Sequence, residues 1–481
     1  MNRLLLSFFV CISCACIARS DEEMTSFQAG AAIANITPER LPVSMTGSFQ
    51  DRMATSVHDP LNARCIVVRD GATKIAIVVC DSCLISREVF DAAKAIASKA
   101  TGIATNRMLM SATHTHTAAT TLALAQCNPD PNYMKTLPAR IAQSVIDANK
   151  RLRPARFGWA VGQAPDEINN RRWFVKPGGI KPNPFGRADD KVRMNPPRGS
   201  DLLIRPAGPV DADVSIWSLV DSADKPIALL ANYGLHYVGG IPANQISADY
   251  FGEFHNQIAK RLGADKSSAD KSFVGILSNG ASGDVNNYNF LKPRPRAAPF
   301  ERVTAVASHI AEVVEKSRGT ANHYEYYLIG MTERTIDLGV RKPNEVELMR
   351  AKNLLAAAAD PKRLNIDELY AQSSVRLMKY PDKVNIKLQT LRIGQAAIVA
   401  IPCEVFAQIG LDIKRQSPFE STFVISLANG YNGYLPTPEQ HKLGGYETWR
   451  SGWSYLEPTA STKITETVVE MLQELSQPAK R

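Results

Sequence analysis

Two of the eight histidines lie two residues apart in Thr113-His114-Thr115-His116-Thr117, directly after an apolar run. In an extended chain, side chains two residues apart point to the same side, so this spacing places both imidazoles together at a strand end. Imidazole is the commonest metal ligand and titrates near neutral pH. The pair could therefore supply two metal ligands, or one ligand and one proton shuttle. On spacing alone, a metal site and a hydrogen-bonded surface pair remain equally open.

Three further polar residues interrupt apolar runs in the same way. They are His236, Glu404 and Tyr434, which follow the runs at 227–233, 396–401 and 422–427. A single histidine at a strand end is usually structural. A carboxylate at the edge of a buried run, however, costs desolvation free energy unless it meets a cation or a metal. Together the three residues favour a shared site at the carboxyl ends of strands, where α/β sheets place their ligands.

The elements that must position these residues alternate along the chain. Strands are predicted at 30–35, 61–68, 74–81, 108–113, 214–220, 227–233 and 273–277, and helices at 87–100, 133–152, 249–262, 302–316 and 462–475. Asp70-Gly71 predicts a hairpin turn between two of the strands. Periodic segments at 324–338, 344–358, 384–393, 396–401, 406–415 and 422–427 continue the alternation. The pattern predicts an α/β fold, with mixed β-sheets layered with α-helices in a single large catalytic domain and the metal site at strand ends.

Composition limits the class of protein. The chain has 481 residues, of which 44% are hydrophobic and 21% charged, and this excludes a disordered tail, a collagen-like repeat and a small disulfide scaffold. The formal charge of +9 raises the question of nucleic acid, but the basic stretch at 151–205 has no nucleic-acid-binding pattern, so no such partner is expected. The part of it at 162–209 is rich in Pro, Gly, Arg and Asn. We interpret that segment as a lid or an insertion loop.

The first twenty residues predict a secretory signal peptide. Arg3 precedes an apolar stretch, and the small residues Ala18 and Ser20 lie near the expected cleavage point. The mature domain would then be residues 21–481, secreted or held in the periplasm or cell envelope. Five cysteines remain in it, namely Cys65, Cys80, Cys83, Cys127 and Cys403. Cys80 and Cys83 form a CxxC that we interpret as small buried residues rather than as a redox pair.

Seven ordered stretches resemble the catalytic domain of the neutral/alkaline, non-lysosomal ceramidases. They are 111–116, 208–211, 232–236, 283–286, 402–406, 429–434 and 445–447. The resemblance extends over roughly residues 28–475 and implies the N-terminal catalytic domain of that family without its C-terminal immunoglobulin-like domain.

The resemblance implies one zinc ion per chain and assigns a role to each site residue. The zinc would be held by His114, His236, Glu404 and Tyr434. His116 would relay a proton to the leaving amine, and Arg171 and Tyr446 would bind the reacting carbonyl and its oxyanion. Asp284 is a candidate to orient one of the ligand histidines.

The implied reaction is hydrolysis of an N-acyl amide bond by zinc-activated water, converting a ceramide-like sphingolipid to a sphingoid base and a fatty acid. The expected partner is a lipid or another N-acyl substrate, and peripheral contact with a membrane surface is an open alternative. No protein partner is predicted. Two other readings remain: the same zinc centre acting on an ester or a different N-acyl substrate, and a non-catalytic envelope binding protein with the same fold.

Overall fold

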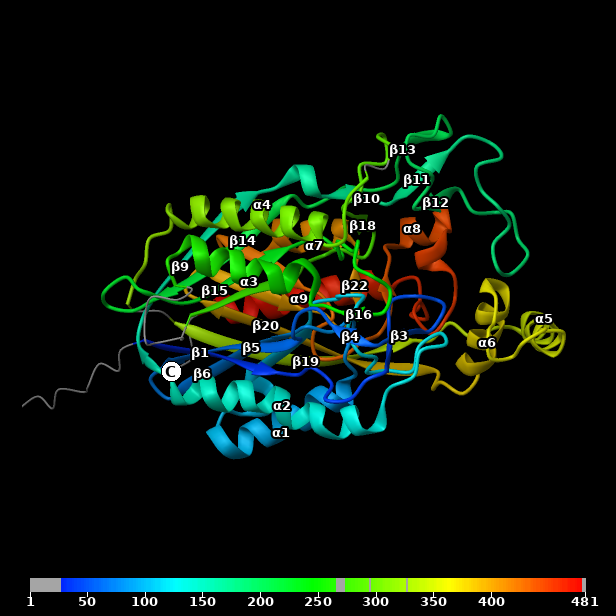
Figure 1. Ribbon diagram of the computed structural model, residues 1–481. Helices are drawn as coiled ribbons and strands as arrows, with labels where there is room; N and C mark the ends of the chain where they lie inside the picture. The colour runs from blue at the N-terminus through cyan, green and yellow to red at the C-terminus, as the bar shows by residue number, and fades with distance from the viewer. Residues whose placement is uncertain (1–26, 265–272, 294–295, 326–327, 478–481) are drawn as a thin grey trace, which may run out of the picture.

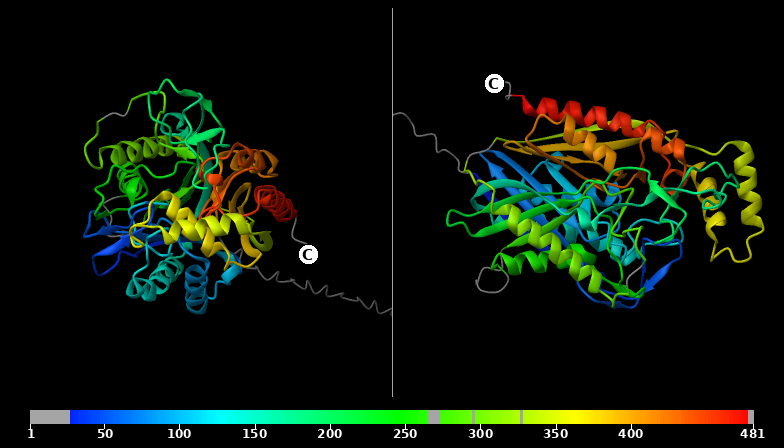
Figure 2. Two further views of the ribbon diagram at one scale, coloured as in Figure 1. Left: turned by 90° about the vertical axis from the view of Figure 1, so that its right-hand side faces the viewer. Right: turned by 90° about the horizontal axis from the view of Figure 1, so that it is seen from above.

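A computed structural model describes residues 27–264, 273–293, 296–325 and 328–477. The predicted signal peptide, residues 1–20, lies outside these ranges. Within them the chain forms mixed β-sheets layered with α-helices (Figure 1), which confirms the predicted α/β fold. Three larger sheets make up the body, and helices surround them on the outside when the molecule is viewed from its end (Figure 2, left).

The first sheet has the strand order β7-β6-β5-β1-β8. Its strands are β1 (Gln28–Asn35), β5 (Asn62–Asp70), β6 (Thr73–Cys80), β7 (Met108–Ala112) and β8 (Arg153–Pro154). The predicted hairpin joins β5 and β6, and it turns at Gly71, whose φ of 54° a residue without a Cβ adopts freely. Helices α1 (Arg87–Thr101) and α2 (Pro131–Lys150) pack their apolar faces against the outer side of this sheet.

The second and third sheets repeat this plan. The second has the order β17-β15-β14-β9 and is covered by α3 (Asp249–Arg261) and α4 (Glu301–Arg318). Its strands are β9 (Arg156–Gln163), β14 (Asp213–Val220), β15 (Pro226–Tyr233) and β17 (Val274–Asn279). The third has the order β19-β20-β21-β23 and is covered by α7 (Ala407–Gln416) and α9 (Ala460–Ser476). Its strands are β19 (Ile329–Gly339), β20 (Lys383–Ile393), β21 (Ala396–Ala400) and β23 (Ser421–Ile425).

The inner faces of the three sheets meet in one common hydrophobic core. Its members include Ile77 and Leu109 of the first sheet, Leu230 and Ile276 of the second, and Ile398 and Phe423 of the third. The central strands are therefore buried on both faces, by this core and by the outer helices. This double burial explains why they read as near-continuous apolar runs in the sequence.

Each of the three sheets contains one parallel pair of strands, and the carboxyl ends of these pairs lie at the same end of the molecule. The pairs are β6/β7, β15/β17 and β21/β23. The short parallel pair β22 (Glu404–Val405) and β24 (Tyr434–Leu435) lies beyond the third sheet, and Glu404 is the register partner of Tyr434. Three separate sheets thus deliver polar residues to one place.

Smaller elements surround that end. The segment 162–209 contains the sheet β12-β11-β13, with β11 (Arg172–Val175), β12 (Val192–Met194) and β13 (Leu203–Pro206). Short pairs are formed by β2 (Val43–Met45) with β3 (Arg52–Ala54), β4 (Ser56–Val57) with β16 (Gln245–Ile246), and β10 (Asn169–Asn170) with β18 (Val285–Asn286). The remaining helices are α5 (Glu345–Ala356), α6 (Ile366–Leu377) and α8 (Pro438–Leu443), with 3-10 turns at Thr105–Arg107, Pro165–Glu167 and Tyr446–Thr448. Among the helices described, none is both long and apolar enough to cross a bilayer.

Candidate metal centre

Three predicted ligands converge from three different sheets. His114 follows β7, His236 follows β15, and Glu404 begins β22 just after β21. Their ligand atoms all lie within 4.8 Å of one another. The two histidine Nε2 atoms are 2.9 Å apart, and Glu404 Oε2 lies 3.3 Å from His114 Nε2 and 3.8 Å from His236 Nε2. All three side chains are buried.

The main chain fixes the tautomer of each histidine in the site. Nδ1 of His114 lies 2.7 Å from the carbonyl oxygen of Cys83, and Nδ1 of His236 lies 3.0 Å from that of Ser282. His116 makes the same contact, at 3.1 Å, with the carbonyl of Gly47. Because a carbonyl oxygen can only accept, each Nδ1 carries a hydrogen, and in a neutral ring Nε2 then presents a lone pair. Lone pairs that face one another cannot hydrogen-bond, so the cluster suits a cation, either a proton on one Nε2 or a metal ion.

The carboxylate supplies an independent test of that fit. Glu404 Oε1 accepts a hydrogen bond of 3.0 Å from the Tyr431 hydroxyl, whereas Oε2 is buried without a hydrogen-bond partner. A buried oxygen without a donor costs free energy unless a positive charge meets it. The free Oε2 faces the same two Nε2 atoms, and two imidazole nitrogens with a carboxylate oxygen are ligands that zinc prefers. The residues present therefore fit a bound metal ion.

The pKa values of the three histidines point the same way. Burial and the neighbouring His114 lower the pKa of both His116 and His236 well below the usual value. Burial opposes protonation of His114 too, but the adjacent Cys83 and Glu404 outweigh it and raise the pKa of His114 to about 10. The cluster thus favours one positive charge next to Glu404, carried by His114 as a proton in the metal-free chain, with His116 and His236 neutral; a bound metal ion would take the place of that proton.

The backbone at the histidine pair is not extended, contrary to what the sequence analysis assumed. The sequence argument assumed an extended chain, but His114 has a left-handed φ of 72°, and its amide bonds the carbonyl of Ser82. The two rings still meet, with centroids 4.7 Å apart and planes at 90°. A strained residue held by its surroundings, rather than a strand pleat, brings the pair together.

The other predicted residues gather on the opposite wall of the site. The Arg171 guanidinium donates through Nη2 to the Tyr434 hydroxyl at 3.0 Å, and its Nη1 lies 3.4 Å from His236 Nε2. The Tyr446 ring lies 5.6 Å from the ring of Tyr434 in an edge-to-face arrangement. Burial and the Glu404 charge raise the pKa of both tyrosines, so both hydroxyls keep their protons as free side chains. The structure therefore brings all seven predicted site residues together.

Sequence reasoning missed the group that holds Arg171 in place. Glu447 is fully buried, accepts from Arg171 Nε at 2.8 Å and from Arg172 Nη1 at 2.5 Å. Arg172 is also fully buried and donates to the Gln440 side chain at 2.9 Å and to the Gly444 carbonyl at 2.6 Å. We call Arg171, Arg172 and Glu447 the arginine wall. Glu447 lies in the stretch 445–447 that resembles the ceramidases, but sequence reasoning assigned it no role, because its partners lie about 275 residues earlier in the chain.

The prediction that Asp284 orients one of the ligand histidines is wrong. Backbone carbonyls, not this carboxylate, hold the ligand histidines. Asp284 instead accepts from the Asn170 side chain and from the Ala407 amide, both at 2.8 Å, and its carbonyl accepts from the Arg171 amide. It therefore ties the segment that carries Arg171 to the start of α7.

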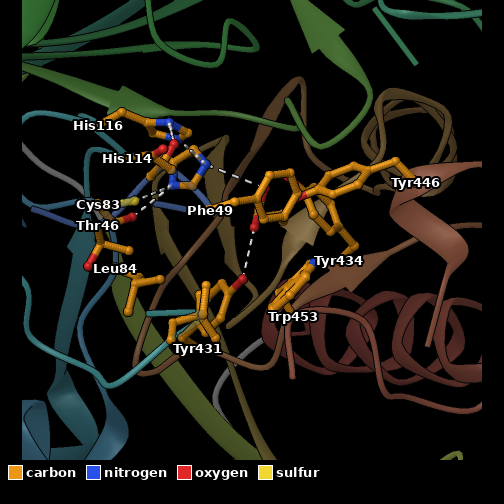
Figure 3. Close-up of a pocket in the computed structure, with 15 residues that line it drawn as sticks. Thr46, Phe49, Cys83, Leu84, His114, His116, Tyr431, Tyr434, Tyr446 and Trp453 are labelled. Carbon is orange, nitrogen blue, oxygen red and sulfur yellow. Dashed lines mark hydrogen bonds and ion pairs between the residues drawn. The ribbon is translucent and has the colours of Figure 1, made fainter. Parts of the chain in front are cut away.

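A cavity of about 110 Å³ opens onto this centre (Figure 3). Its lining includes His114, His116, Glu404 and Tyr434 of the centre, and the rest of the lining is mainly apolar and aromatic. The wall residues include Phe49, Leu84, Leu124, Tyr431, Tyr446 and Trp453. Cys83 also lines it and, as interpreted from the sequence, is a buried free thiol like the other cysteines described. A polar centre at the end of an apolar pocket suits a substrate with one reactive polar group and a hydrocarbon chain.

The fold and site define an α/β protein with a candidate metal centre at the carboxyl ends of strands from three sheets. No family model matches the chain, and a search of curated proteins finds no match. Among solved structures it is similar to the neutral ceramidase from Pseudomonas aeruginosa, with a TM-score of 0.68 and 18% identity over 94% of this chain and 74% of that one. A ceramidase complexed with C2 gives a TM-score of 0.69 and 17% identity over 95% and 76%. The chain therefore has the neutral ceramidase fold, which confirms the likeness that its motifs predicted.

Proposed function

We propose that this protein is a zinc-dependent hydrolase of N-acyl amide bonds, with ceramide-like lipids as its substrates. The observation that carries the proposal is the convergence of two Nε2 lone pairs and an unpartnered Glu404 oxygen at the end of an apolar pocket. Support also comes from the shared fold with two ceramidases. The products would be a fatty acid and an amine, such as a sphingoid base.

The proposed ligands of one zinc ion are His114, His236, Glu404 and Tyr434. A zinc ion bound there would supply a Lewis acid and lower the pKa of a bound water toward about 7. Both histidine ligands hold a hydrogen on Nδ1 against a main-chain carbonyl, so Nε2 of each is the atom that would bind the ion. His114, whose pKa is raised to about 10, would lose its Nε2 proton when the ion binds. Tyr431 donates to the other oxygen of Glu404 and so orients the carboxylate.

The remaining residues act on the substrate. His116 holds its hydrogen on Nδ1 and leaves Nε2 unprotonated, so Nε2 can accept a proton and pass it to the leaving amine nitrogen. The Arg171 guanidinium and the protonated Tyr446 hydroxyl are donors for the carbonyl oxygen as negative charge develops on it. Removal of one such donor typically lowers kcat by about 10²–10³.

The proposal also includes a cleaved signal peptide and a substrate-selecting segment. We infer that residues 1–20 are removed on export and that residues 21–481 form one hydrolase domain, secreted or in the cell envelope. The segment 162–209, which contributes Arg171 and the sheet β12-β11-β13, is the proposed lid or insertion that selects the substrate. N-terminal sequencing of the exported protein tests the cleavage site.

The first experiment measures the metal content of the mature protein, produced by export and purified without a histidine tag. We expect near one zinc per chain, its loss in Glu404→Ala, and its retention in the control Glu420→Ala, which changes an exposed glutamate. Zinc-dependent release of fatty acid from N-acyl amides should follow the metal. Metal with ester hydrolysis alone would indicate the ester alternative. A folded protein that takes up no zinc would contradict the hydrolase proposal and leave a binding protein.

A further inference from the structure

The helical pair α5–α6 stands at the same end of the molecule as the candidate metal centre. In Figure 1 and in the right view of Figure 2 it projects beyond the body, and in Figure 1 α5 lies outside α6. The pair is attached to the residues that form the pocket. The Gln126 side chain bonds both the amide and the carbonyl of Leu364, and the Tyr370 ring lies 5.2 Å from the ring of the pocket residue Trp453. Whatever meets α5 is therefore held close to the pocket.

The outward face of α5 is apolar. Val346 is 77% exposed and Met349 is 65% exposed, and Val346 is the most exposed large hydrophobic side chain in the ranges described. With Arg350, Asn353, Leu354 and Ala357 they line one shallow groove along the helix. The spacing i, i+3, i+7, i+11 puts Val346, Met349, Asn353 and Ala357 on one side. Ala351 is the buried residue of this helix, whereas Val346 and Met349 are mostly exposed and so contribute little to packing within the chain.

The size and charge of this face limit what can cover it. A stable dimer buries about 800 Å² on each partner, which is more than one stripe of a twelve-residue helix offers. The exposed cations Arg350, Lys352, Lys362 and Arg363 exceed the exposed acids Glu345, Asp360 and Asp367 by one, so a polyanion gains little. Two exposed apolar side chains on the outermost helix, with charged residues beside them, suit shallow insertion into the interfacial region of a bilayer.

We propose that the outward face of α5 docks on a lipid bilayer, with Val346 and Met349 inserted among the acyl chains. The reason for such docking rests on the proposed function, because a substrate with long hydrocarbon chains must pass from a bilayer into the pocket. Docking through α5 sets the bilayer beside the pocket. Because the local net charge is small, apolar insertion drives the contact, and binding depends weakly on salt and on anionic lipid.

The test compares matched double variants on vesicles of phosphatidylcholine alone. Val346→Glu/Met349→Glu places two charges on the stripe, and Ile96→Glu/Val161→Glu places two at exposed apolar positions on α1 and β9. In co-sedimentation we expect the first pair to lower the partition coefficient at least about tenfold and the control to leave it unchanged. Equal binding of all three proteins would overturn the proposal. So would binding that requires anionic lipid, or a dimer without lipid that the first pair dissociates.

Two substrates separate this inference from the proposed function. The Val346→Glu/Met349→Glu protein should hydrolyse a soluble short-chain N-acyl amide at the wild-type kcat/KM and lose activity on the same head group embedded in vesicles. If neither substrate is cleaved by any protein while vesicle binding still depends on α5, the hydrolase proposal fails and the docking surface stands. If the Val346→Glu/Met349→Glu protein and the Ile96→Glu/Val161→Glu control cleave both substrates equally well, the docking surface fails and the hydrolase proposal stands.

Discussion

The two walls of the candidate site are held in different ways. On one wall, which we call the histidine wall, His114, His116 and His236 each donate from Nδ1 to a main-chain carbonyl. On the arginine wall, one buried carboxylate, Glu447, holds both guanidinium groups. The first arrangement follows from the path of the backbone, and the second depends on the chemistry of a single side chain. Substitutions should therefore damage the two walls by different routes.

The largest expected effect comes from Glu447→Gln on the arginine wall. It leaves two buried guanidinium groups facing a neutral amide, and removing one partner of a buried ion pair costs about 3–5 kcal/mol. We expect urea unfolding to show a loss of that size and kcat to fall, because Arg171 is no longer held toward Tyr434. The control is Glu439→Gln, an exposed position on nearby α8.

The zinc content of the Glu447→Gln protein tests whether the two walls are independent. If the walls are independent, folded Glu447→Gln protein keeps its zinc, since none of the Nδ1 contacts involves Glu447. Loss of zinc from protein that remains folded would show that the arginine wall also supports the ligands.

The second expected effect comes from Gly47→Ala on the histidine wall. Gly47 has a φ of 113°, and a Cβ there would lie 2.5 Å from Cγ of His116. The strain costs about 1–3 kcal/mol, and the displaced imidazole should lower kcat at least about tenfold while zinc stays bound. Gly178→Ala is the matched control, because Gly178 also has a positive φ but faces open space. An equal loss of kcat in both variants would indicate a general effect of strain rather than the position of His116.

A smaller effect is expected in the pH dependence of stability. Burial opposes ionisation of Glu447, but Arg172 and Arg171 overcome it and lower the pKa of Glu447 below 4.5. A carboxylate with a lowered pKa stabilises the fold above pH 4.5, and this contribution is lost as pH falls through the folded-state pKa. The difference in unfolding free energy between wild type and Glu447→Gln should therefore shrink below pH 4.5. Urea titrations at pH 7 and at steps below pH 5 measure it, and a constant difference would argue against an ionised Glu447.

The contrast between the walls also explains which features the sequence could predict. Helix 87–100 and the hairpin between 61–68 and 74–81 were predictable because their apolar spacing and turn residues are local signals. The candidate ligands stood out because each follows an apolar run, but their assignment to one zinc ion came from the resemblance to the ceramidases. Helix α6 was missed although its capping box, Asn365 with Glu368, is a local signal. The strands of the sheet β12-β11-β13 are only three or four residues long, which is too short for a periodic pattern. The role of Glu447 depends on residues far away in the chain, and the left-handed turn at His114 has no signature in the residue types.

The smallest expected effect is the one that most directly tests the histidine wall. Cys83 Sγ lies 3.8 Å from His114 Nδ1, but the hydrogen bond of 2.7 Å is made by the Cys83 carbonyl. Cys83→Ala removes the thiol and keeps that carbonyl. We expect unchanged zinc content, kcat within about threefold, and a loss of about 1 kcal/mol from the small cavity. Because Cys83, His114 and His116 could themselves hold an ion, loss of zinc would make the thiol a ligand. The histidine wall would then depend on a side chain, as the arginine wall does, and the distinction between them would fail.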